Sequence, residues 1–70
     1  DSKSIITYDN IVKVSGLTGG EIISVYNILG SKVYTLTATQ DTEYITSLNE
    51  GIYTVSIDGT KIAEKVLIAK

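Results

Sequence analysis

The sequence predicts an all-β domain, built as a small antiparallel sandwich or barrel. Eleven isoleucines, six valines and nine threonines make 26 of the 70 residues β-branched, while Pro, Phe, Trp and Met are absent. Branched side chains fit the pleated, half-buried surface of a strand. Period-2 alternation recurs about every eight to twelve residues between Gly, Asn and Asp, which is typical of a series of short strands. The length suits one domain over residues 1–70, with a small core and no deep pocket.

Four strands are expected in the first half of the chain, at 4–8, 11–15, 21–27 and 32–38. In the second of them, Val12 and Val14 lie on the face opposite Lys13, because side chains alternate along a strand. The third and fourth are apolar on both faces. The third strand is therefore expected to be central or covered by a loop, and its second face, if exposed, would be a site for a partner. For the fourth strand, the pattern leaves open whether Tyr34 and Leu36 belong to the core.

Three more strands are expected, at 43–47, 52–57 and 60–69. Lys61 and Lys65 fall on one face of the last strand, and its apolar residues fall on the other. The same alternation predicts the core, which we expect to consist of Val12, Val14, Ile23, Val25, Val33, Tyr53, Val55, Ile57, Ile62, Val66 and Ile68.

Glycine residues indicate where loops connect the predicted strands. Asp58-Gly59 stands between two strand patterns, which predicts a two-residue hairpin loop with a type I′ turn. Gly30 is expected to close a five-residue hairpin loop with a positive φ, and Gly51 to end the loop before the sixth strand. The glycine-rich segment 15–21 lacks the Gly-Lys-Ser/Thr of a P-loop and the GxGxxG of a dinucleotide fold, so a turn is expected there.

The charge pattern argues against two classes of partner. The chain carries six lysines and no arginine against eight acidic residues, for a net charge of −2. A basic footprint for nucleic acid is therefore missing. The lysines are scattered along the sequence, so a polybasic patch for membrane binding is missing as well. No apolar run approaches the roughly 20 residues needed to insert into a bilayer.

The titratable groups form no recognisable catalytic or metal motif. The chain has no histidine to activate a serine or threonine and no cysteine for thiol chemistry. Asp41 and Glu43 form the closest acidic pair, which supplies fewer oxygens than a calcium loop requires. We therefore expect no enzyme activity, no cofactor and no metal. The acids considered for these roles fall at turns or solvent-facing positions: Asp9, Asp41, Glu43, Glu50, Asp58 and Glu64.

Three segments carry a family resemblance: "ISVYNILGSKV" (23–33), "ITSLNEGIYTVSI" (45–57) and "KIAEKVLIAK" (61–70). In this order they resemble the C-terminal sorting domain of the type IX secretion system, found on Bacteroidetes surface proteases of the gingipain kind. Ser31-Lys32 replaces the arginine common after the loop glycine, and the "YPNP" opening of many members is missing. The matched positions are the strand tyrosine, the loop glycine and its valine, the L-x-x-G-x-Y element and the terminal lysine with its apolar neighbour: Tyr26, Gly30, Val33, Leu48, Gly51, Tyr53, Lys65 and Val66.

The resemblance implies a seven-stranded immunoglobulin-like β-sandwich that acts as an address and catalyses nothing. It further implies the C-terminal domain of a larger exported protein, which crosses the periplasm to the outer-membrane surface or the medium. The implied partners are the outer-membrane type IX translocon and a sortase-like peptidase that removes the domain.

An edge strand offers a physical route to recognition, because a receptor can add a strand to its unpaired backbone groups. We expect the terminal strand and its lysine face to form the signal, although edge lysines also serve to prevent sheet-to-sheet aggregation. The candidates are Gly51, Tyr53, Lys61, Lys65, Val66, Leu67, Ile68 and Lys70, with Gly30 as the loop glycine.

Two other functions stay open. One is an adhesin or carbohydrate-binding accessory module, which would need at least two of Tyr8, Tyr34 and Tyr44 coplanar on one exposed face. The other is a structural or oligomerising domain, such as a weak homodimer through an edge strand.

Overall fold

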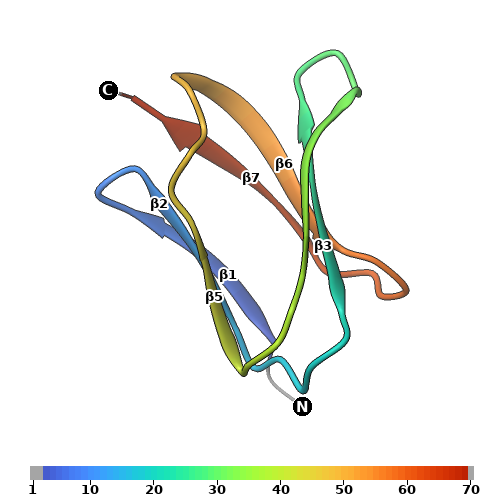
Figure 1. Ribbon diagram of the computed structural model, residues 1–70. Coiled ribbons are helices and arrows are strands. Elements are labelled where there is room, and N and C mark those ends of the chain that lie inside the picture. The colour runs from blue at the N-terminus through green and yellow to red at the C-terminus, as the bar shows by residue number, and fades with distance from the viewer. Residues whose placement is uncertain (1–2, 70) are drawn as a thin grey trace.

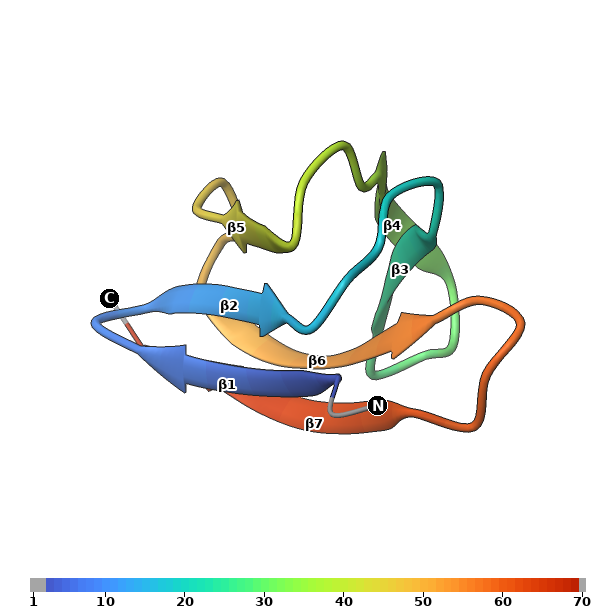
Figure 2. The ribbon, with the colours of Figure 1, turned by 90° about the horizontal axis from the view of Figure 1, so that it is seen from below.

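Two antiparallel sheets pack face to face in the computed structural model, which describes residues 3–69 (Figure 1; Figure 2). The predicted all-β sandwich is confirmed, and each of the seven predicted strands overlaps an observed one. One sheet has the order β1-β2-β5, formed by β1 (Ser4–Tyr8), β2 (Ile11–Ser15) and β5 (Thr42–Ile45). The other has the order β4-β3-β6-β7, formed by β3 (Ile22–Asn27), β4 (Lys32–Thr37), β6 (Gly51–Ile57) and β7 (Ala63–Ile68).

The chain changes sheet three times. The β1-β2 hairpin lies in one layer, β3 and β4 in the other, β5 returns beside β2, and β6 and β7 join β3. This is the order of an immunoglobulin-like sandwich in which the fourth strand belongs to the sheet of the third, sixth and seventh strands. As expected from its apolar faces, β3 is a central strand, paired with β4 on one side and β6 on the other.

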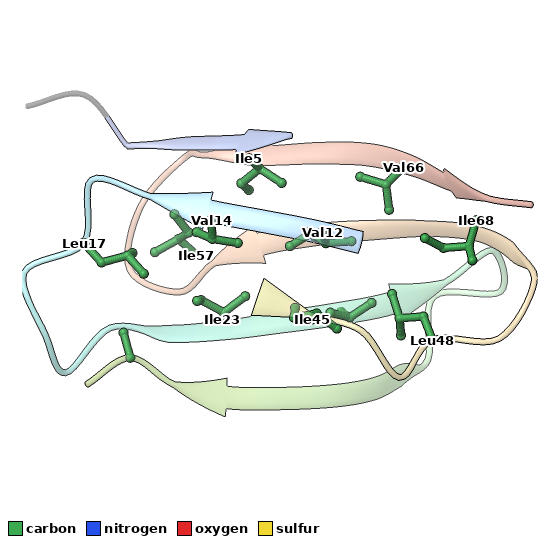
Figure 3. Packing of buried hydrophobic residues seen from close by; sticks show 13 residues of the cluster. Ile5, Val12, Val14, Leu17, Ile23, Ile45, Leu48, Ile57, Val66 and Ile68 are labelled. Atoms are coloured by element: carbon green, nitrogen blue, oxygen red, sulfur yellow. The ribbon is translucent and has the colours of Figure 1, made fainter. Parts of the chain in front are cut away.

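The core fills the space between the two sheets (Figure 3). Eight of the expected residues are buried in it: Val12, Val14, Ile23, Val25, Val55, Ile57, Val66 and Ile68. Tyr53 and Ile62 are partly buried and pack against them. Five further core residues were not predicted, and three of these come from loops: Ile5, Leu17, Ala38, Ile45 and Leu48.

The expectation that Val33 lies in the core is wrong, because its side chain is 48% exposed. The pairing of β3 with β4 shifts between Val25 and Tyr26, so that Val25 faces Tyr34 while Tyr26 faces Lys32. Val33 is thus the extra residue of a β-bulge, which takes it out of the alternation. Tyr34 and Leu36 pack against the core instead.

The type I′ turn expected at Asp58-Gly59 is also wrong, although the hairpin exists. Only Gly59 has a positive φ there, +80°, whereas a type I′ turn needs two such residues. The loop between β6 and β7 is longer than the two residues expected, and Thr60 stabilises it. The hydroxyl of Thr60 donates to the carbonyl of Ile57 at 2.7 Å and accepts from the amide of Ile62 at 3.1 Å. β7 therefore begins only at Ala63.

A two-residue turn with both central residues at positive φ occurs instead between β1 and β2. Asp9 and Asn10 have φ values of 50° and 61°, and Tyr8 pairs directly with Ile11. This is the geometry of a type I′ turn, which Asn and Asp tolerate better than other residues with a side chain.

Candidate recognition surface on the β4-β3-β6-β7 sheet

The last strand, β7, lies at an edge of its sheet with β6 as its neighbour. Its side chains split between two faces. Val66 and Ile68 point into the core and are buried, whereas Lys65 and Leu67 face outward, with Leu67 62% exposed. The predicted signal residues therefore do not form one surface. Of these predicted residues on β7, Lys65 and Leu67 are the ones accessible to a partner on the outer face.

Lys61, another of the terminal candidates, lies outside the last strand. Lys61 was expected on the lysine face of the last strand, but it lies in the loop before β7 and is exposed there. The longer turn organised by Thr60 is the reason for this difference. Lys70 lies outside the described residues.

Gly51 and Tyr53 belong to a structural corner at the start of β6. The hydroxyl of Tyr53 donates to the carbonyl oxygen of Asn49 at 2.9 Å. A Cβ atom on Gly51 would lie 3.6 Å from the Tyr53 ring, and Leu48 beside them is buried. This is the tyrosine corner that immunoglobulin-like sandwiches place where the chain enters their sixth strand. The L-x-x-G-x-Y element is thus accounted for by the fold.

The side chain of Asn27, the last residue of β3, stabilises the loop between β3 and β4. The side-chain oxygen of Asn27 accepts hydrogen bonds of 3.0 Å from the amides of Leu29 and Ser31. Gly30 has the expected positive φ, +87°, and its amide donates to the carbonyl of Asn27 at 3.0 Å. The loop spans four residues, 28–31, one fewer than expected. Its tip exposes two large apolar side chains, with Ile28 75% and Leu29 86% exposed.

A shallow hollow of about 410 Å³ lies on the outer face of this sheet, between the β3-β4 loop and β7. Strand register places Lys32, Tyr26, Thr54 and Lys65 in one row across all four strands. The ammonium of Lys32 lies 5.9 Å from the centre of the Tyr26 ring, within the range of a cation–π contact. The hollow is lined by Tyr26, Asn27, Ile28, Gly30, Ile52, Thr54 and Lys65.

The electrostatics of this hollow are one-sided. Among the described residues its lining contains one lysine and no carboxylate, and Lys32 lies beside its tyrosine wall. In residues 3–69 no group of three or more acidic, histidine or cysteine side chains could hold a metal ion. The hollow can therefore offer an apolar floor, a hydroxyl and positive charge, which suits binding rather than acid–base chemistry.

The glycine-rich segment 15–21 forms the expected turn, and a carboxylate holds it together. Glu21 accepts hydrogen bonds from the amide and hydroxyl of Thr18, at 2.9 and 3.0 Å, and from the amide of Gly19 at 2.8 Å. Lys3 lies 3.9 Å away. The hydrogen bond from the Thr18 amide, supported by the others, lowers the pKa of Glu21 from 4.5 to about 2. These contacts close a loop and do not build a reactive site.

The outer face of the other sheet carries two of the three tyrosines considered for sugar binding. Tyr8 and Tyr44 are both about half exposed there, on β1 and β5, with β2 between them. Tyr34 is partly buried and packs against the core. A platform of all three is therefore not formed, while Tyr8 and Tyr44 share one face.

Sequence reasoning identified Tyr26, Gly30 and Lys65 separately but did not bring them together, and it did not single out Ile28 or Ile52. The signal for Ile52 was present, because alternation places it with Thr54 on the face opposite the buried side of β6. The order of the four strands in the sheet could not be predicted from the sequence of any single strand.

The family model that matches the chain covers residues 1–68 and is described as a "Domain of unknown function (DUF6383)". No curated protein and no solved structure shows significant similarity to the chain. Residues 3–69 contain no helix long and apolar enough to cross a membrane.

Proposed function

We propose that this chain, which belongs to the DUF6383 family of domains of unknown function, is a recognition domain that serves as a C-terminal sorting signal for type IX secretion. The observation that carries the proposal is the position of β7. It is an edge strand that exposes Lys65 and Leu67 outward while Val66 and Ile68 anchor it in the core. The proposed partners are the outer-membrane translocon and a sortase-like peptidase, and the proposed destination is the cell surface or the medium.

An edge strand that is anchored in the core is suited to recognition by another protein. A receptor strand laid beside β7 would pair with its free backbone groups, and the alternate side chains would give specificity. The two buried residues fix the strand in place, so that little ordering free energy is lost when a partner binds.

The end of β7 is also held from the opposite sheet. The amide of Ala69, one residue after the strand, donates to the side-chain oxygen of Asn10 at 2.9 Å. Asn10 belongs to the β1-β2 turn, so a contact across 59 residues of sequence fixes the last strand. This supports the view that β7 is presented to a receptor as a rigid element.

An export assay tests the proposal. Residues 1–70 are fused behind a reporter that carries a periplasmic signal, in a bacterium with type IX secretion. Deleting residues 66–70 would remove two core side chains and unfold the domain, so point variants are the better probe. The double variant Lys65→Glu/Leu67→Thr alters only outward side chains, and Lys13→Glu on the opposite sheet is its charge-matched control.

We expect the reporter at the surface or in the medium for the intact domain and the control, and in the periplasm for the double variant. Retention of the intact, folded domain in the periplasm would contradict the sorting function. Export of the double variant at the rate of the intact domain would show that the outward side chains of β7 do not carry the signal.

A second candidate function rests on Tyr8 and Tyr44, which expose their rings on one face of the three-stranded sheet. Aromatic rings on an exposed face are suited to stacking against sugars, so an accessory carbohydrate-binding module is the alternative. A glycan array probed with the domain and with Tyr8→Ala/Tyr44→Ala tests it. Binding that the double variant loses would favour the module over the sorting signal.

A further inference from the structure

We infer that the hollow on the outer face of the β4-β3-β6-β7 sheet binds an extended peptide of a partner protein in which an acidic and a bulky apolar side chain are two residues apart. The inference deepens the proposed function and rests on it for its biological role, but the binding itself can be measured without export. It is carried by the apolar floor, by Lys65, which has no ion pair within the described residues, and by the spacing of the side chains along β7.

The floor and rim of the hollow are apolar and accessible. Ile52 is 41% exposed on β6, it pairs with Leu67 on β7, and Ile28 projects from the neighbouring loop. Tyr26 supplies an aromatic wall. Apolar side chains gathered in one hollow, in a domain with a complete core of its own, indicate a surface that a partner covers. The volume of about 410 Å³ is enough for one or two large side chains.

The charge of the hollow selects the partner. Lys65 lines it and forms no ion pair within residues 3–69, and Lys32 lies beyond the Tyr26 ring. No carboxylate of residues 3–69 lines the hollow to neutralise either lysine. A second copy of this chain docked face to face would bring like charges together, which is unfavourable. An acidic partner would instead place its carboxylate against Lys65.

The two-residue spacing of the acidic and apolar side chains in the peptide is inferred from strand β7. Lys65 and Leu67 are two residues apart on the same face of β7, which corresponds to about 6.6 Å along an extended chain. A peptide that runs beside them therefore matches both only if its own acidic and apolar side chains have the same period. Residues adjacent in sequence would point to opposite faces of the peptide.

The walls of the hollow are fixed before a partner arrives. Asn27 holds the β3-β4 loop through two side-chain hydrogen bonds, and Tyr26 and Thr54 lie on paired strands. A preformed site loses little conformational freedom on binding, so a short peptide can be expected to bind measurably.

The experiment is an NMR titration of the ¹⁵N-labelled domain with a blocked hexapeptide that carries glutamate and leucine two residues apart. One control peptide replaces the glutamate with glutamine, and another places glutamate and leucine side by side. We expect saturable shifts centred on the amides of Tyr26, Gly30, Thr54 and Lys65, and weaker binding of both control peptides.

Variants of the domain complete the test. Lys65→Gln is expected to weaken binding of the glutamate peptide about two- to fivefold, as is typical of an exposed ion pair. Ile52→Thr should weaken the glutamate and glutamine peptides alike, because it acts on the apolar floor. Lys13→Gln, which removes a lysine from the opposite sheet, should leave binding unchanged.

Three results would overturn the inference: no saturable shifts with the glutamate peptide, shifts confined to the three-stranded sheet, or equal binding of all three peptides. Saturable binding in the hollow together with unimpaired export of Lys65→Gln and Ile52→Thr would support the binding site and count against its role in sorting. Failure of the binding site and failure of the proposed function are thus read from separate assays.

Discussion

The hydroxyl of Tyr53 donates a 2.9 Å hydrogen bond to the carbonyl oxygen of Asn49, four residues earlier. This bond joins the loop after β5 to the start of strand β6, and the tyrosine ring lies against the open face of Gly51. The glycine and the tyrosine of the L-x-x-G-x-Y element therefore stabilise the fold. Recognition residues must therefore be sought among the neighbours that the corner positions, such as Ile52.

The Tyr53 corner predicts a stability effect. Tyr53→Phe keeps the ring and removes the hydrogen bond, so the free energy of unfolding should fall by about 0.5–1.5 kcal/mol. Urea denaturation followed by circular dichroism measures it. Tyr44→Phe, at an exposed position on the other sheet, is the control and should change the value little. Equal effects of the two changes would show that the corner bond contributes nothing.

The Asn10 contact can be separated into its two parts. Asn10→Gly removes the hydrogen bond to Ala69 but accepts the φ of 61°, whereas Asn10→Ala removes the bond and adds backbone strain. The alanine variant should be about 1 kcal/mol less stable than the glycine variant. Hydrogen exchange should become faster at the Ala69 amide in both. An unchanged exchange rate there would contradict the proposed anchoring of β7.

The hydrogen bonds to Glu21 predict a dependence of stability on pH. Because folding lowers the pKa of Glu21 from 4.5 to about 2, its contribution is full above about 4.5 and is lost as the pH falls towards 2. The difference in melting temperature between the native domain and Glu21→Gln should therefore shrink over that window. Glu50→Gln, in an exposed loop, controls for the loss of one negative charge. A constant difference down to pH 2 would show that the ionised carboxylate is not what holds the loop.

The hydrogen bond between Ser24 and Asp58 predicts an energetic coupling between strand β3 and the β6-β7 turn. Its side chain is fully buried and donates to the carboxylate of Asp58 at 2.9 Å, which ties the β6-β7 turn to β3. Ser24→Ala should lower the free energy of unfolding by about 1–3 kcal/mol, since the acceptor is charged. In a double-mutant cycle, Asp58→Asn and Ser24→Ala should be less than additive. Strict additivity would mean that the two side chains do not interact in solution.

Lys65 distinguishes recognition from protection of the edge. If the lysine acts in recognition, Lys65→Gln should stay monomeric at concentrations where the native domain is monomeric, while losing affinity for the glutamate peptide. Light scattering and sedimentation measure the solution mass. Self-association of the variant would favour the view that Lys65 prevents edge-to-edge pairing.

Much of the fold could be predicted from local alternation. The period-2 pattern located all seven strands, because buried and exposed side chains alternate along a half-buried strand. Val33 was misplaced because the bulge that displaces it depends on the pairing of two strands. Thr60 moved the start of β7 through side-chain bonds that no pattern of hydrophobicity reveals.

The hollow could not be predicted for a related reason. Tyr26, Ile52 and Lys65 come from three strands, and only the register of the sheet makes them neighbours. Leu17, Ala38 and Leu48 entered the core from loops, where alternation gives no signal. Local sequence thus predicted elements and faces, while the contacts between distant segments required the structure.

The stacking of the first strand on the last has a kinetic consequence. β1 lies over β7, with Ile5 near Val66 in the core (Figure 2; Figure 3). During synthesis, the apolar side of β1 therefore has no covering layer until β7 has been made, and loop-closing contacts of this length slow folding. A nascent copy of this domain should remain open until its last strand leaves the ribosome, and it should close in a single late step.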